Sequence, residues 1–241
     1  MTERSFFVHN EKEPLDREKR NVHRMEESMI KWIKTHQYCL TGLYLFVFLF
    51  GFFLLEVFAP SPKFIVHSVF DDWIPFNEWF VIPYFFWYLW VPLFLIFFMI
   101  REKEAYLELC FIMFAGATLC LIIYILCPTG LELRGEITKT NLCSGAVRLL
   151  RRIDPPQNVC PSIHVSSTVA IHLVVCRSVT FKQNRKIKML SLFVTLMISI
   201  STLFIKQHSV IDVLYGWIVS GFFAVLTYRT DFVYRFVGEE N

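Results

Sequence analysis

The chain has 241 residues, of which 55% are hydrophobic, 17% aromatic and only 19% charged, with a net charge of +3. Its mean hydropathy is +0.47. Soluble domains average roughly 45–50% apolar and about 25% charged residues. The composition therefore excludes a water-soluble globule and a disordered chain, and it indicates an integral membrane protein. No run of charge of one sign suggests a nucleic-acid partner.

Six apolar segments predict an all-α, polytopic protein with six transmembrane helices. A helix needs about 20 apolar residues to cross a bilayer, and charged residues or prolines bound each segment. The segments are residues 38–58, 79–100, 105–127, 162–179, 187–205 and 209–228. The fourth is the most polar, because it contains two histidines and five hydroxyl side chains.

The distribution of Lys and Arg orients these helices. If the N terminus is cytoplasmic, most of the 24 Lys and Arg residues fall on the cytoplasmic side, as the positive-inside rule requires. Both termini are then cytoplasmic. Residues 1–37 form a basic segment, which is either an amphipathic helix on the inner leaflet or a solvated arm. Residues 38–104 supply two helices with an aromatic outer loop, residues 105–228 the catalytic core of four helices, and residues 229–241 a short tail.

Three polar clusters, residues 128–134, 160–164 and 206–212, lie at ends of the predicted spans. An odd-numbered span exits on the outer side of the membrane and an even-numbered span begins there. We therefore expect all three clusters to meet on the extracytoplasmic face and to build one site. Polar groups within spans are costly, and they face a bundle interior or a cavity.

The residue types in these clusters suit phosphoryl transfer. His208 and Asp212 are four residues apart, which places both on one face of a helix. The carboxylate can fix the tautomer of the imidazole and leave its other nitrogen as a nucleophile or base. His164 lies at a predicted helix start, which favours a bound anion, and Arg134 and Lys206 add positive charge. A nucleophile, a general acid, an orienting carboxylate and fixed cations are the parts that metal-free phosphoryl transfer needs.

Other polar residues carry less chemistry. The seven cysteines include no C-x-x-C pair, and no histidine spacing fits zinc, so the sequence predicts no metal and no cofactor. Cys143 and Cys160 flank a polar loop and could pair if that loop faces an oxidising compartment. His172 lies deep in the fourth span and is expected to be a packed polar residue. Three arginines are expected at the interface or on lipid phosphates, namely Arg148, Arg151 and Arg152.

Two of these clusters carry a resemblance. The run P-S-I-H at residues 161–164 resembles the P-S-G-H motif of the type 2 phosphatidic acid phosphatase superfamily, and H-S-V-I-D at residues 208–212 resembles the end of its S-R-x5-H-x-x-x-D motif. Ser201 stands at the start of that motif, and the order of the motifs along the spans is also similar. The resemblance covers roughly residues 105–228.

The resemblance implies a role for each matching residue. His208 attacks phosphorus and forms a phosphohistidine, Asp212 orients His208, and His164 protonates the leaving oxygen. Ser162 holds the phosphate through its hydroxyl or through neighbouring amides, and Arg134 matches the arginine of the K-x6-R-P motif. Four positions depart from the family pattern: Cys127 replaces its lysine, Gly135 its proline, Ile163 its glycine and Thr202 its arginine.

Lys206 lies about one turn after Thr202, so it is expected to face the same site and to replace part of the missing charge. The run D-P-P-Q-N at residues 154–158 is similar to a bacterial branch of the family. The sequence therefore predicts a lipid phosphatase that hydrolyses a lipid phosphomonoester or pyrophosphate. The alternatives are a sphingomyelin-synthase-like or inositol-phosphorylceramide-synthase-like phosphotransferase, a transporter with a proton or headgroup pathway, and an inactive structural member.

Overall fold

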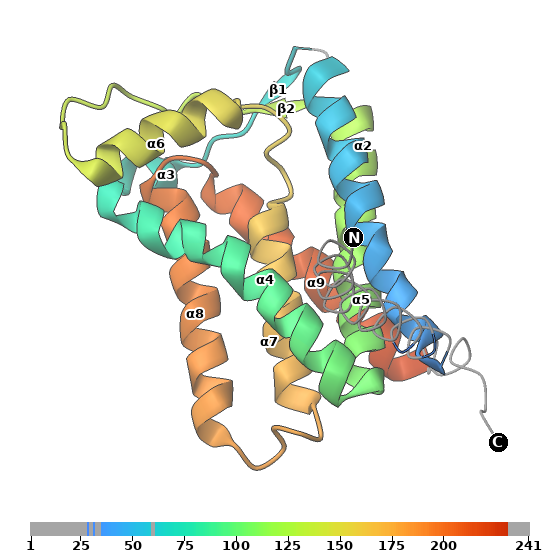
Figure 1. The fold of residues 1–241 in the computed structure, drawn as a ribbon. Helices are drawn as coiled ribbons and strands as arrows, with labels where there is room; N and C mark the ends of the chain where they lie inside the picture. The colour runs from blue at the N-terminus through green and yellow to red at the C-terminus, as the bar shows by residue number, and fades with distance from the viewer. Residues whose placement is uncertain (1–27, 29–30, 32–34, 59–60, 231–241) are drawn as a thin grey trace, which may run out of the picture. The chain divides into compact units, whose positions relative to one another are not determined.

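The computed structural model describes residues 28, 31, 35–58 and 61–230. The chain divides into two units, Met1–Leu40 and Thr41–Asn241. The second unit contains every site discussed below and is described by itself (Figure 1). The expected amphipathic helix in residues 1–37 and the tail beyond residue 230 fall almost wholly outside the described residues.

Each of the six apolar segments is helical, which confirms the all-α, multi-pass prediction. The helices are α2 (Tyr44–Phe58), α4 (Val81–Arg101), α5 (Lys103–Leu126), α7 (Ile163–Arg177), α8 (Arg185–Phe204) and α9 (Val210–Thr230), with the 3-10 turns η1 (Gln37–Leu43) and η2 (Glu78–Phe80) leading into α2 and α4. Five of the six are long and apolar enough to cross a membrane, with α2 counted together with η1 (Gln37–Phe58, 22 residues) and α4 together with η2 (Glu78–Arg101, 24 residues). The exception is α7, which has 15 residues and ends at Arg177, so six full spans are not established.

The short helix α7 forms the centre of the bundle. It packs against α4, α5, α8 and α9, and most of its residues between Val165 and Val175 are buried. The backbone at the start of α7 approaches α9 closely at Gly216, where a Cβ atom would lie 2.8 Å from the Ser162 carbonyl oxygen. Deeper in the helix, His172 lies 2.8 Å from the Ser191 hydroxyl, as expected for a packed polar residue.

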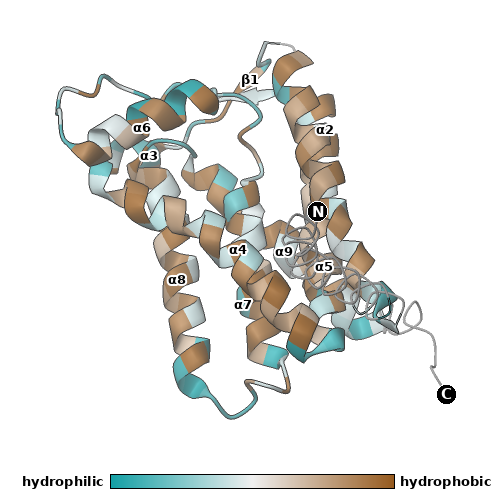
Figure 2. Cartoon of the chain, in the orientation of Figure 1, coloured by the Kyte–Doolittle hydropathy of each residue, from teal (hydrophilic) through white to brown (hydrophobic). Residues whose placement is uncertain are grey.

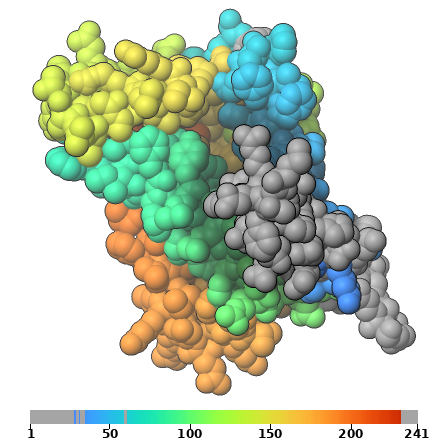
Figure 3. All heavy atoms as spheres, viewed as in Figure 1, coloured from blue at the N-terminus to red at the C-terminus, as the bar shows by residue number. Residues whose placement is uncertain are grey.

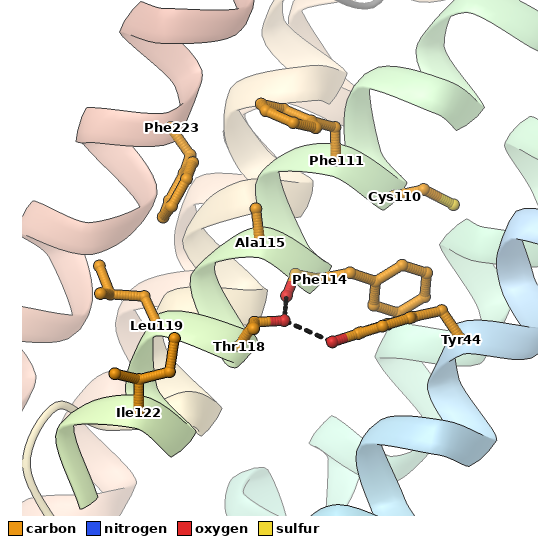
Figure 4. Close-up of a pocket in the computed structure, with 9 residues that line it drawn as sticks. All are labelled: Tyr44, Cys110, Phe111, Phe114, Ala115, Thr118, Leu119, Ile122 and Phe223. Carbon is orange, nitrogen blue, oxygen red and sulfur yellow. Dashed lines mark hydrogen bonds between the residues drawn. The ribbon is translucent and has the colours of Figure 1, made fainter. Parts of the chain in front are cut away.

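Helix α2 packs on α5 and presents apolar side chains outward. Figure 2 shows hydrophobic residues along this helix, and Phe46, Phe50 and Phe53 are all exposed, as suits a surface in contact with lipid. A hydrogen bond between two hydroxyl groups joins the N-terminal end of α2 to α5. The Tyr44 hydroxyl lies 2.5 Å from the Thr118 hydroxyl, which donates to the Phe114 carbonyl (Figure 4).

The short helices and strands between the spans lie at one end of the bundle, which we call the α6 end. Helix α6 (Leu142–Ile153) lies across it and packs on α4 (Figure 3). The short helix α3 (Val69–Trp73) and two short parallel strands, β1 (Phe64–Ile65) and β2 (Thr129–Gly130), complete this end, with Phe64 paired with Thr129. None of these elements was predicted from the sequence.

Candidate active site

A cavity of about 190 Å³ opens between the helices at the α6 end. It draws on α2, α4, α5, α7, the end of α6 and the turn between α8 and α9. All three sequence clusters contribute to this end of the bundle. The polar side chains in its wall are Glu56, Arg134, Asp154, Gln157, Asn158, His164, Gln207 and His208.

His208 lies two residues before the start of α9, with Asp212 in the first turn of that helix. Its Nδ1 atom lies 3.4 Å from Asp212 Oδ2. Asp212 is fully buried and its Oδ2 also accepts the Ser209 amide at 2.8 Å, while its Oδ1 has no hydrogen-bond partner. The carboxylate therefore fixes the start of α9 and faces one nitrogen of the imidazole. The 3.4 Å distance between the imidazole and the carboxylate is compatible with catalysis, because hydrogen bonds between catalytic groups are often longer when no substrate is bound.

The turn that carries His208 is closed by the C-terminal cap of α8. The helix ends at Phe204, and Lys206 adopts a left-handed conformation with φ 59°. The Gln207 amide donates to the Thr202 carbonyl at 2.9 Å and the Lys206 amide to the Leu203 carbonyl at 3.1 Å. This pattern is a Schellman motif, in which glycine is the usual residue at the left-handed position.

Lys206 consequently points away from the cavity. Its Nζ donates to the Asp71 carbonyl oxygen at 2.7 Å, and Lys206 does not line the cavity. Burial lowers the pKa of its ammonium, although Asp71 and Asp72 act in the opposite direction. The expectation that Thr202 and Lys206 share one helix face is wrong, because α8 ends between them.

Asp71 of α3 holds the start of α9. This carboxylate is 2% exposed. It accepts hydrogen bonds from the Ser209 hydroxyl at 2.6 Å and from the amides of Val210 and Ser68, each at 2.8 Å. Negative charge at a helix N terminus is stabilising. The loop before α4 thus fixes the turn that carries His208.

His164 lies in the first turn of α7 within an aromatic setting. Its ring centroid is 4.7 Å from that of Tyr84 and 4.4 Å from that of Trp87. The rings of His164 and His208 are 5.9 Å apart, and both line the cavity. The Nε2 atom of His164 is buried and has no hydrogen-bond partner, so it is available to a bound group.

Arg134 is the one cationic side chain among the cavity-lining residues that the structure describes. It donates to the Asp154 carbonyl at 2.8 Å and to the Gln207 side-chain oxygen, while its Nε has no partner. Burial lowers the pKa of this guanidinium and raises the pKa of the Asp154 carboxyl. The Nε2 of Gln207 is also buried and unpartnered.

The remaining predicted site residue, Ser162, is fully buried. Its hydroxyl accepts the Val165 amide and caps α7, and its own amide donates to the Asp212 carbonyl at 3.1 Å. It links the two helix starts and does not line the cavity. Cys143 and Cys160 are both free. Among the described residues, no group of three or more His, Cys, Asp or Glu side chains could hold a metal ion.

Three functional candidates were not predicted from the sequence: Asp71, Gln207 and Glu56. Asp71 closes a capping box with Ser68, a signature that is visible in sequence as S-x-x-D. Gln207 adjoins His208 and was available by proximity. Glu56 carried a weaker signal, as the single acidic residue in the first apolar segment.

These features define a helical membrane protein with a His, His and Asp site at one end of its bundle. The profile of the PAP2 superfamily matches residues 105–235, more than half of the chain, and the chain belongs to this superfamily. Searches of curated proteins and of solved structures gave no match. Membership indicates phosphatase-type or phosphotransferase-type activity on phosphoesters. Glu56, Asp71, Tyr84 and Trp87 lie outside the matched region.

Proposed function

We propose that this protein cleaves a phosphoester of a membrane lipid through a phosphohistidine intermediate on His208. One observation carries the proposal: the His164 and His208 rings line one cavity with centroids 5.9 Å apart, and Asp212 lies behind His208. A nucleophile held by a carboxylate and a second imidazole available as acid are the arrangement that covalent catalysis with proton transfer requires.

In the first step, the free nitrogen of His208 attacks phosphorus. The bond between phosphorus and the leaving oxygen breaks, its electron pair stays on that oxygen, and protonated His164 supplies the proton. In the second step, His164 takes a proton from the acceptor, whose oxygen attacks phosphorus, and the bond between phosphorus and His208 breaks. Arg134 stabilises the charge on the phosphoryl oxygens.

Ser162 and Lys206 lie outside the cavity and bind backbone groups of the segments that carry the site. Ser162 joins the starts of α7 and α9, and Lys206 joins the His208 turn to α3. We propose that they position the histidines and that Arg134 supplies the main contact with the phosphate. We propose that this site lies on the extracytoplasmic face of a cell membrane, with both termini cytoplasmic, and the distribution of Lys and Arg supports this orientation.

Two forms of the reaction share the first step. With water as the acceptor, the protein is a lipid phosphatase acting on a phosphomonoester or pyrophosphate. With an alcohol as the acceptor, it is a lipid phosphotransferase. The second form is favoured by one observation: Arg134 is the one cation among the described residues of the cavity wall, which suits a phosphodiester monoanion better than a phosphomonoester that carries about −1.5 to −2 charges.

The test is to incubate the purified protein with radiolabelled lipid phosphates and phosphodiesters, with and without lipid alcohols. Release of free phosphate supports the phosphatase, and label transferred to the alcohol supports the phosphotransferase. Both activities should survive EDTA, because the proposed steps use only side chains of this chain. Loss of activity with EDTA that added metal restores would contradict the mechanism, as would no turnover of any lipid.

A further inference from the structure

Aromatic side chains of α4 face the imidazole of His164. The ring centroid of Trp87 lies 4.4 Å from that of His164 with an angle of 48° between the planes, and the ring centroid of Tyr84 lies 4.7 Å away with an angle of 32°. The Tyr88 ring is 6.4 Å away and nearly perpendicular to the imidazole. Because positions three and four apart share one face of a helix, α4 presents these three rings together. We call Tyr84, Trp87 and Tyr88 the aromatic cradle.

The ring of Trp87 is held by the helix that carries His164. Its Nε1 donates a hydrogen bond to the Ser167 hydroxyl at 2.8 Å. That hydroxyl donates in turn to the carbonyls of Ile163 at 2.7 Å and His164 at 3.2 Å. Tyr84 is fully buried. The two rings nearest to the imidazole are therefore fixed in place by α7 and by packing.

The acid role proposed for His164 requires a positive charge where little else stabilises it. Burial penalises the charged form of a histidine, and no carboxylate forms an ion pair with His164 among the described residues. The His208 ring, 5.9 Å away, competes for the proton because Asp212 favours positive charge on His208. Two imidazoles this close titrate as a coupled pair. The position of the proton therefore depends on what surrounds each ring.

Other groups of the cavity wall do not hold a proton on His164. Arg134 opposes a second positive charge nearby. Within the described part of the chain, the hydrogen bonds of Arg134, Tyr124 and Glu56 go to partners other than the His164 ring. The titratable or charged side chains that share the cavity with His164 are Glu56 of α2, Tyr88 of α4, Tyr124 of α5, Arg134 and Asp154 on either side of α6, and His208 before α9.

The faces of aromatic rings can supply the missing stabilisation. A cation within about 6 Å of the centroid of a Trp or Tyr ring is attracted by the ring, and the attraction is stronger where water is excluded. The imidazole lies within this range of both Trp87 and Tyr84. Its Nε2 atom is buried without a partner, so a proton on this atom is available to a bound ligand.

We propose that Trp87 and Tyr84 are positioning residues that stabilise the protonated form of His164 and so supply the proton for the leaving oxygen. The proposal rests on the proposed function and concerns its acid step. When the bond between phosphorus and the leaving oxygen breaks, the electron pair stays on that oxygen. The oxygen takes the proton of His164, neutral imidazole remains in the aromatic cradle, and phosphorus is bonded to His208.

The experiment measures single-turnover phosphorylation of His208 in the full chain, in micelles and at saturating substrate. The lipids are phosphatidic acid and phosphatidylglycerol, a monoester and a diester that both release diacylglycerol, and the faster of the two is used. The diacylglycerol oxygen needs a proton to leave, whereas the phenolate of p-nitrophenyl phosphate leaves without one. We expect Trp87→Leu to slow phosphorylation from the lipid about tenfold and to leave phosphorylation from p-nitrophenyl phosphate within about twofold of the wild type.

The pH profile with the lipid is a second measurement. Without the Trp87 ring, His164 loses its proton sooner as the pH rises, so the rate in Trp87→Leu should fall at a lower pH than in the wild type. Trp87→Phe keeps an aromatic face and should give an intermediate profile. Phe94→Leu is the matched control, because Phe94 is a buried aromatic residue of α4 whose ring contacts in the described structure are with other aromatic residues, namely Trp90, Phe97 and Phe98. It should lower the unfolding temperature and keep the profile of the wild type.

A third measurement places Trp87→Leu in the His164→Ala background, where it should cause no further loss because its effect acts through His164. The pH profile and this double variant need only the lipid, so they also decide the outcome if p-nitrophenyl phosphate is not a substrate. An unchanged rate and pH profile in Trp87→Leu, an equal loss with both substrates, or a further loss in the His164→Ala background would overturn the role of the aromatic cradle and leave the phosphohistidine chemistry intact. Absence of phosphorylated His208 in the wild type with every substrate would overturn the proposed function and this proposal with it.

Discussion

The link between α3 and the His208 turn makes a prediction about Asp71. Its two carboxylate oxygens accept three hydrogen bonds, two on Oδ2 from Ser68 and Ser209 and one on Oδ1 from Val210. Asparagine offers a single acceptor oxygen. In Asp71→Asn, at least one charge-assisted bond is therefore replaced by a contact between two N–H donors.

The expected cost follows from these contacts. A hydrogen bond to a charged group contributes about 1.5–3 kcal/mol, and negative charge at the start of α9 contributes about 0.3–1 kcal/mol. We expect Asp71→Asn to lower the free energy of unfolding by about 2–4 kcal/mol. Because the same turn carries His208, we also expect phosphoenzyme formation to slow about tenfold, which equals about 1.4 kcal/mol in the barrier.

The assay combines thermal unfolding in detergent with single-turnover phosphorylation. Asp72→Asn is the matched control, because the neighbouring carboxylate is 59% exposed and lies 2.9 Å from His67 rather than in the α9 cap. An exposed pair of this kind contributes little. If Asp71→Asn and Asp72→Asn give the same unfolding temperature and the same phosphorylation rate, the reasoning about the α3 link is refuted.

Three further predictions concern the cap at Lys206, the close approach at Gly216 and the C-terminal end of α7. Lys206→Gly should retain more turnover than Lys206→Met, because glycine fits the left-handed φ of 59°. Equal loss of turnover in both variants would mean that the Lys206 ammonium acts on the substrate phosphate. Gly216→Val should reduce kcat and stability by forcing α9 away from the Ser162 carbonyl, whereas Gly221→Val, with open space at its Cβ, should change neither in assays of turnover and unfolding. Burial alone would raise the pKa of Glu102, but hydrogen bonds from Ser178, Thr180 and Val179 outweigh it and hold that pKa below its usual value. The stabilisation is present above the unfolded pKa of about 4.3 and is lost as pH falls through the folded pKa. Unfolding curves should therefore show Glu102→Gln less stable than wild type at pH 7 and converging with it in acid. The control Glu104→Gln, on an exposed side chain, should be as stable as wild type at pH 7.

Local sequence patterns predicted the helices well. Each apolar segment is a helix, because a run of apolar residues with charged or proline boundaries specifies a helix in a membrane by itself. The fourth segment, residues 162–179, is helical over Ile163–Arg177, and at its end Glu102 accepts hydrogen bonds from the Ser178 hydroxyl and the Val179 amide. His208 and Asp212 lie 3.4 Å apart, but the prediction that both lie on one face of a helix is wrong, because His208 precedes α9.

Contacts between residues far apart in the sequence could not be predicted from such local patterns. Ser209 and Asp71 are 138 residues apart, and Glu56 and Asn158 are 102 apart. No periodicity encodes these pairs, because they depend on how separate helices pack. Lys206 shows the same limit at short range: helical spacing predicted that it faces the site, but a C-terminal cap one residue earlier turns it toward Asp71.

The central claim is that His208 carries the phosphoryl group, and the most direct test is to quench the reacting protein and map the modified residue by mass spectrometry. We predict a phosphoramidate on His208 of the wild type, none in His208→Ala, and formation slowed by about 10²–10⁴-fold in His164→Ala, as general acid catalysis implies. Phosphorylation that persists in His208→Ala, or that maps to His164 in the wild type, would contradict the account.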